Sequence, residues 1–209
     1  CAEEPRITKT INLDLFYEHR YNQLIMPNTV PGILGVSGNN LPPINEGKVE
    51  NKGFELELTH NNRIGSLSYF LNVNASFARN KILFMDEAPK QYQWLQTTGR
   101  PIGQYYGYTA IGFFRSVEEI NNSPTQFGTV IPGDLKYQDL NSDGVIDGND
   151  MGYIGGSNVP EVYYGLSGGI NWKNFDVSFL LQGAANSFRN NAGIGYWEFF
   201  NGGKVTEAH

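Results

Sequence analysis

The sequence has a single cysteine, Cys1, among its 209 residues, so no disulfide can form within the chain. Charged residues are also few, at 17% of the chain, and the formal net charge is -6. Clusters of Lys and Arg are absent, which argues against a nucleic-acid partner, because such clusters hold a polyphosphate. An apolar run of about 18 residues is absent as well, so no transmembrane helix is predicted. Transmembrane strands give a weaker, alternating signal and stay possible.

Signatures of catalysis are missing too. The histidines His19, His60 and His209 have no metal-ligand spacing, and the sequence contains no phosphate-binding loop or GxSxG motif. Glu55 and Glu57 resemble the carboxylate pair of a glycosidase. Residues two apart on a strand line one face, however, so a polar face explains both glutamates. We therefore expect no enzymatic activity.

Glycine and aromatic residues are abundant: 25 Gly, 12 Tyr and 13 Phe. This composition is typical of an all-β protein rich in turns. Alternation of apolar and polar residues predicts antiparallel, up-and-down strands, each with one apolar face. The expected strands are residues 10–24, 53–60, 68–80, 164–172 and 175–183.

The connections between these strands alternate in length. Short turns are expected at 61–63 and 173–174, and long loops at 27–52, 81–160 and 184–209. Short turns at one end and long extracellular loops at the other are typical of an outer-membrane β-barrel, whose apolar face meets lipid and whose polar face meets a wet lumen. Five strands cannot close a barrel, and hydrocarbon does not tolerate an open sheet edge. The sequence therefore predicts part of a transmembrane β-barrel.

Two local motifs lie inside the second long loop. The sequence SVEEINN, residues 116–122, predicts a short helix with Ser116 as N-cap and Glu119 at the third helical position. Further on, PGDLKYQDLNSDGVIDGND, residues 132–150, carries oxygen-bearing side chains at the spacing of a twelve-residue calcium loop that starts at Asp139. Gly144 stands at position 6, where such a loop bends sharply.

The Asp-rich loop, residues 139–150, is thus a candidate structural Ca²⁺ site. An Asp at position 12, where Glu is usual, predicts a looser, dockerin-like site. A polar turn without a metal is the alternative, because Asp, Asn and Gly also gather in turns. The predicted ligands are five side chains and the carbonyl of Val145: Asp139, Asn141, Asp143, Val145, Asp147 and Asp150.

Four segments carry a family resemblance: VENKGFELEL (49–58), GRPIGQYYGY (99–108), PGDLKYQDLNSDGVID (132–147) and YYGLSGGINWKNFDVSFLLQG (163–183). They resemble the later part of the barrel of SusC/RagA-like TonB-dependent transporters of the Bacteroidetes outer membrane. The resemblance implies a large barrel in the outer membrane of a Gram-negative bacterium that encloses a plug, is lidded by a SusD-like surface lipoprotein and takes energy from TonB. The plug and the TonB-interacting segment are not found in this sequence, so transport is not expected from these residues alone.

The resemblance also implies an oligosaccharide or peptide as the imported substrate. Aromatic side chains in the loops can stack on sugar rings, although aromatics also form girdles at the membrane rim or pack loop interiors. Trp172, beside a short turn, is expected in a girdle. The candidate substrate-binding residues are Tyr92, Trp94, Tyr105, Tyr106, Trp197 and Phe200.

A soluble, secreted β-sandwich that binds carbohydrate and carries a structural calcium is the alternative from a different class. It predicts that the apolar faces of the strands are buried between two sheets. The barrel prediction requires the opposite, an apolar face that no part of the chain covers.

Overall fold

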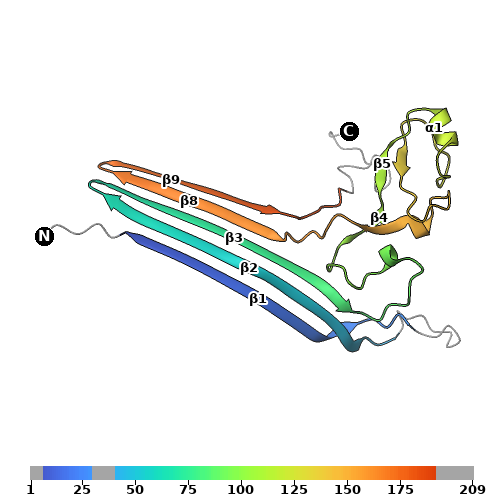
Figure 1. Cartoon of the computed structure of the whole chain (residues 1–209), viewed down its shortest axis with the longest axis horizontal. Helices are drawn as coiled ribbons and strands as arrows, with labels where there is room; N and C mark the ends of the chain where they lie inside the picture. Colours follow the sequence, from blue (N-terminus) through green and yellow to red (C-terminus); the bar gives the residue numbers. More distant parts are fainter. Residues whose placement is uncertain (1–6, 30–40, 192–209) are drawn as a thin grey trace, which may run out of the picture.

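A five-stranded antiparallel sheet forms the main body of the molecule and is open rather than closed (Figure 1). The computed structural model describes residues 7–29 and 41–191. The prediction of an all-β, antiparallel fold is confirmed. The strands, in their spatial order, are β1 (Thr8–Ile25), β2 (Ile44–Ile64), β3 (Leu67–Phe84), β8 (Val162–Trp172) and β9 (Phe175–Ala185).

The strands extend further toward the long connections than the sequence pattern indicates. A loop is predicted over 27–52, but β2 begins at Ile44, so residues 44–52 belong to the strand. This part of β2 continues to pair with β1, with register shifts between Arg20 and Leu24. β3 and β9 likewise take residues from expected loops. Apolar alternation stops before these extensions, so the sequence pattern does not show them. The extensions still form strand, because backbone pairing requires no apolar side chain.

Two tight turns join strands at the end of the sheet away from the excursion (Figure 1). The prediction of the first turn at 61–63 is wrong: these residues continue β2, and Gly65 and Ser66 make the turn. Gly65 has a φ of 62°, a left-handed conformation that glycine adopts without strain. The second turn is at Lys173 and Asn174, as expected. Two-residue turns of this kind suit the right-handed twist of the strands they join.

Four glycines of the sheet lie directly opposite an aromatic residue of the neighbouring strand. A Cβ atom at any of them would come closer than 3.0 Å to the facing side chain, so each ring covers the bare backbone of its glycine. A one-residue slip would separate every pair, so these contacts help to fix the register. The pairs are Gly53 with Phe16, Gly169 with Phe70, Gly168 with Phe179, and Gly183 with Tyr164.

The excursion, residues 85–161, is folded and stands beyond the loop end of the main sheet (Figure 1). It contains two small antiparallel sheets. In one, β4 (Tyr105–Tyr108) pairs with β7 (Met151–Ile154). In the other, β5 (Ala110–Phe113) pairs with β6 (Leu135–Tyr137).

Helix α1 (Val117–Asn121) begins as the sequence predicts, because Ser116 Oγ accepts a 3.2 Å hydrogen bond from the backbone N–H of Glu119. Buried apolar side chains are few in the described part of the chain: Phe114 and Ile146, both in the excursion, are each 3% exposed. Among the described residues, none of the helices is long and apolar enough to cross a bilayer.

Candidate functional site

One face of the main sheet is apolar and uncovered. On β1, Ile11 and Leu15 are 73% and 77% exposed. Large exposed apolar patches are rare on soluble monomers and mark surfaces that meet a membrane or another protein. A second sheet packed on this face, which the β-sandwich alternative requires, is absent from residues 7–29 and 41–191. One row of register partners crosses all five strands: Ile11, Leu58, Val73, Leu166 and Leu181.

The opposite face is polar. Asp14 is the register partner of Glu55, and Asn12 Nδ2 donates a 3.2 Å hydrogen bond to Glu57 Oε2. A groove of about 410 Å³ runs over these residues and over Asn74. Glu55 and Glu57 therefore belong to an open polar surface, which agrees with their interpretation as strand residues rather than as a catalytic pair.

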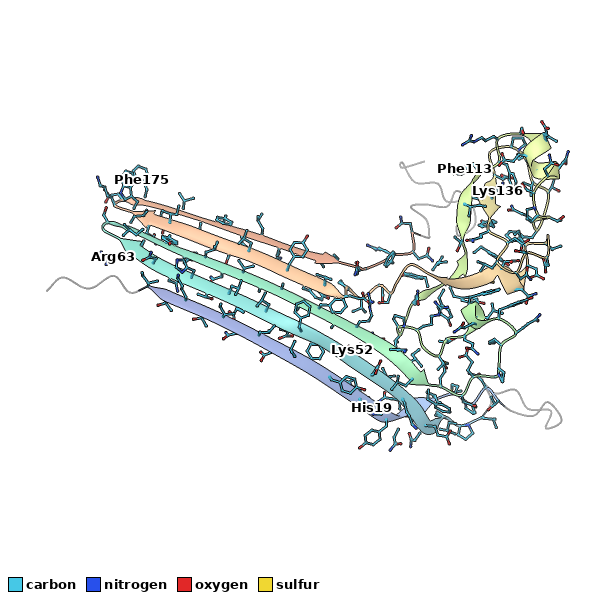
Figure 2. The ribbon with its side chains drawn as sticks, viewed as in Figure 1. His19, Lys52, Arg63, Phe113, Lys136 and Phe175 are labelled. Atoms are coloured by element: carbon cyan, nitrogen blue, oxygen red, sulfur yellow. The ribbon has the colours of Figure 1, made fainter. Side chains whose placement is uncertain are left out.

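The apolar face ends on the loop side at a sharp boundary. Phe54 and Phe77 are register partners, and the next pair on the same face is Lys52 with Arg79. The Arg79 guanidinium lies 5.4 Å from the centre of the Phe77 ring, so it turns back toward the apolar side. Figure 2 shows Lys52 near the loop end of the sheet. The sequence analysis missed this boundary because it placed Lys52 in a loop, whereas Lys52 lies in β2.

Charged residues continue beyond this boundary. Glu50 and Lys81 form the next pair of register partners. Arg79 makes a bidentate ion pair with Glu161, with distances of 2.8 Å and 2.6 Å. Tyr17 donates a 3.2 Å hydrogen bond from its hydroxyl to Glu50. The same face of the sheet is thus apolar along most of its length and charged at its loop end.

In the Asp-rich loop, the carboxylates accept hydrogen bonds from the loop's own backbone. Asp139 accepts from the N–H groups of Ser142 and Gly144, at 2.6 Å and 2.9 Å, and Asp143 accepts from that of Val145 at 2.9 Å. Gly144 has a φ of 83°, in keeping with the expected bend. Within residues 7–29 and 41–191, no three His, Cys, Asp or Glu side chains form a group that could hold a metal ion. The calcium site stays a prediction that rests on residue spacing.

Asp150, the twelfth position of the loop, is fully buried, with 0% exposure. One carboxylate oxygen accepts a 2.8 Å hydrogen bond from Leu140 N and the other a 2.9 Å bond from Asp147 N. The Asp147 side chain in turn accepts from Asn149 N at 2.7 Å. Buried carboxylates are stable when backbone N–H groups satisfy them. Asp150 therefore joins the two ends of the loop, a role that the spacing argument did not assign to it.

Tyr92 and Trp94 pack against the Asp-rich loop. Their rings are stacked, with centres 4.5 Å apart and planes within 8°. Trp94 Nε1 donates a 2.7 Å hydrogen bond to the carbonyl oxygen of Asn149, and Asn141 Nδ2 lies 3.5 Å from the Tyr92 hydroxyl. The structure thus brings two predicted substrate-binding residues together with two residues of the predicted calcium loop, as supports for that loop.

Tyr105 and Tyr106 lie at the start of β4. Tyr105 is half-buried, and its hydroxyl accepts a 3.3 Å hydrogen bond from Asn190 N. Tyr106 is 44% exposed and contacts Tyr153 edge to face, with ring centres 5.0 Å apart. It is the most open of the four described candidates for substrate contact. The other two candidates, Trp197 and Phe200, lie outside the described residues.

Glu87 organises the start of the excursion, and sequence reasoning missed it. Its carboxylate accepts hydrogen bonds from Thr97 N at 2.8 Å and from Thr98 N at 3.0 Å, and the Thr97 hydroxyl also bonds that of Tyr153. Partial burial raises the pKa of Glu87, but the hydrogen bonds from Thr97 and Thr98 outweigh it and hold the pKa below its ordinary value. No local motif marks Glu87, because its partners are 10 and 11 residues away.

The chain is similar to a known receptor over most of its own length. No family model matches the chain. TonB-dependent receptor P26 of Formosa agariphila is 29% identical over 203 residues, which are 92% of this chain and 20% of the receptor. The chain thus spans about a fifth of the length of this relative.

Solved structures of the RagAB system share the fold. The RagAB peptide importer in its open-open state matches with a TM-score of 0.60 at 15% identity, over 86% of this chain and 19% of the importer chain. The RagAB peptide transporter matches with a TM-score of 0.59 at 14% identity, over the same shares. The resemblance to SusC/RagA-like TonB-dependent transporters is confirmed. These relatives are a receptor and importers rather than enzymes, in agreement with the sequence analysis.

Proposed function

We propose that this chain forms part of the wall and outer loops of a TonB-dependent outer-membrane transporter that imports oligosaccharides or peptides. The observation that carries the proposal is the two-sided sheet, with an uncovered apolar face opposite a polar one. In an outer-membrane barrel the first kind of face meets lipid and the second lines the lumen. Similarity to a TonB-dependent receptor over 92% of the chain supports the same reading.

The height of the apolar face fits a bilayer. On β3 it extends from Leu67 to Phe77. That distance is ten steps of about 3.4 Å, and at a tilt of about 40–45° it spans about 25 Å of membrane, the height of the apolar band of such barrels. Trp172 and Phe175, 47% and 70% exposed, stand at its tight-turn end as rim aromatics (Figure 2 labels Phe175).

The complete protein would act with partners. We assign it a SusD-like surface lipoprotein over the loops, and TonB through regions outside these residues. The RagAB relatives are described as peptide importers, which favours a peptide over an oligosaccharide as the first substrate to test. Of the four described candidates, Tyr106 is the one best placed to meet a substrate, because it is the most exposed of them. A structural Ca²⁺ in the Asp-rich loop is proposed on its spacing.

The test compares two neighbouring residues of β2 in the complete protein. Leu56→Cys lies on the apolar face and Glu57→Cys on the polar face. Each is introduced in a background from which Cys1 and any other cysteine of the complete protein have been removed, and is labelled with a small fluorophore in detergent. After reconstitution with brominated lipids, quenching should be strong at position 56 and weak at position 57. Equal quenching at both positions, or the reverse order, would rule out the proposed sidedness.

A further inference from the structure

Arg100, in the excursion, has an accessible guanidinium group without an acidic partner. Its backbone is fixed, because its N–H donates a 3.1 Å hydrogen bond to the carbonyl oxygen of Thr97 and its carbonyl accepts a 2.9 Å bond from Ile82 N of β3. The guanidinium forms no hydrogen bond or ion pair with a described residue. Arg100 is half-buried, yet none of its nitrogen atoms is both buried and without a partner. The group is therefore open to a ligand.

The ring of Tyr153 holds this guanidinium in place. Arg100 Cζ lies 5.3 Å from the ring centre, which is a cation–π distance. The Tyr153 hydroxyl is bonded to that of Thr97, and Thr97 N donates a 2.8 Å hydrogen bond to Glu87. The Glu87 carboxylate is occupied by Thr97 and Thr98 and makes no ion pair with Arg100. Arg100 is thus oriented by an aromatic ring while its charge stays available.

An exposed aromatic surface adjoins the same ring. Tyr106, 44% exposed, contacts Tyr153 edge to face with ring centres 5.0 Å apart, so Tyr106 and Arg100 both border Tyr153. Tyr108 faces the same side of β4 two residues further on. Its ring centre lies 5.2 Å from that of Phe127, which is 55% exposed. A cation therefore stands beside a row of aromatic rings, of which two are open to solvent.

This arrangement fits a ligand that carries a carboxylate next to an apolar group. A guanidinium holds a carboxylate through two parallel N–H···O bonds, and an exposed aromatic ring receives an apolar group on its face. The C-terminal residue of a peptide has both parts. The charge of the excursion favours a peptide over an acidic polysaccharide: residues 85–161 carry ten acidic and four basic side chains, which repel a polyanion but attract the ammonium group at the other end of a peptide.

We propose that Arg100 binds the C-terminal carboxylate of an imported peptide and that the C-terminal side chain of the peptide lies on Tyr106. The inference rests on the proposed function and narrows its substrate to peptides with a free carboxyl end. All unmodified peptides share this group, so one site can accept many sequences. Tyr153 is a positioning residue, because it contacts Arg100 and Tyr106 rather than the carboxylate.

The experiment uses the complete protein in detergent, with native mass spectrometry to count bound peptide. The probe is a mixture of short random peptides, synthesised once with free carboxyl ends and once with C-terminal amides. The wild type should bind the free form about tenfold more tightly, the difference expected for a charge-assisted hydrogen-bonded pair. In Arg100→Gln this preference should disappear, and Arg100→Lys, which keeps the charge but not the two parallel bonds, should retain part of it.

Arg115→Gln is the matched control, since it removes the same charge elsewhere in the excursion and should keep the preference within about twofold of the wild type. Tyr106→Ala should weaken binding of both mixtures alike, because the ring meets the side chain and not the carboxylate. Binding of the amide mixture by Arg100→Gln shows that this variant is folded.

Three results would overturn the proposal: wild type that binds both mixtures equally or binds neither, an Arg115→Gln variant that loses the preference as Arg100→Gln does, or an oligosaccharide of galacturonate that competes as strongly as the free peptides. Failure of the proposed function is distinct, because the fluorophore at position 56 would then escape quenching by lipid.

Discussion

The indole N–H of Trp94 donates a 2.7 Å hydrogen bond to the carbonyl oxygen of Asn149, 55 residues further along the chain. This bond joins the segment that follows β3 to the end of the Asp-rich loop. The Tyr92 ring stacks on the Trp94 ring, and the Tyr92 hydroxyl lies 3.5 Å from Asn141 Nδ2 of the same loop. The aromatic pair and the Asp-rich loop thus form one unit, and substitutions in either part should affect the other.

Trp94→Phe should loosen the Asp-rich loop. The substitution keeps an aromatic ring against Tyr92 but removes the N–H group, so the Asn149 carbonyl loses its partner at a cost of about 1 kcal/mol. Limited proteolysis of the complete protein should show faster cleavage within residues 139–150. Tyr106→Phe is the control, because the Tyr106 hydroxyl makes no hydrogen bond to a described residue. Equal cleavage rates in Trp94→Phe and wild type would contradict the supporting role of Trp94.

Asp150→Asn should destabilise the same loop whether or not calcium is present. The carboxylate receives backbone N–H groups on both oxygens. An amide would turn an NH₂ group toward one of them and leave a buried donor unsatisfied, which costs about 1–3 kcal/mol. Hydrogen exchange at the amides of Leu140 and Asp147 is the measurement, and both should exchange faster in the variant. Protection as strong as in the wild type would show that Asp150 does not anchor the loop.

Calcium should protect the wild-type loop from proteolysis if the spacing of its oxygen ligands has been read correctly. Asp143→Asn keeps the shape of the side chain and removes one charge from the predicted ligand set, so it should shift the protecting calcium concentration upward by about tenfold. Asp134→Asn, outside the twelve-residue loop, is the control and should respond as the wild type does. If neither calcium nor chelator changes the cleavage rate of the loop, these residues form a polar turn only.

The fold class and the sidedness of the strands were predictable from the sequence because both follow from a period of two. Ile11 and Leu15 fall on one face in any register that keeps the strand straight. The outer ends of the strands were not predictable in this way. Lys52 and Glu50 belong to β2 through backbone pairing with β1 and β3, and their side chains carry no apolar alternation. The contacts of Glu87 were equally hidden, because hydrogen bonds to distant loop amides leave no periodic signal.

Acid should loosen the start of the excursion through Glu87. Its pKa in the folded chain lies below the ordinary value of 4.5. The group therefore contributes stability that is present above 4.5 and is lost as the pH falls below 4.5 through the folded-state pKa. Exchange at the amides of Thr97 and Thr98, relative to intrinsic rates, should increase over that range. Glu87→Gln should remove the pH dependence, and an unchanged profile in this variant would assign it to another group.

Gly53→Ala should disrupt the pairing of β2 with β3. A Cβ at this position would lie 1.9 Å from the backbone oxygen of Phe77 and 2.6 Å from the ring of Phe16. The backbone cannot yield as a flexible side chain does, so overpacking on the order of 1–3 kcal/mol is expected. Gly148→Ala is the matched control, since a Cβ there meets no atom within 4 Å. Urea unfolding of the complete protein in detergent should show a lower midpoint for Gly53→Ala than for Gly148→Ala. If the two midpoints coincide, the Phe77 backbone does not approach Gly53 this closely and the register assigned to β2 and β3 is incorrect.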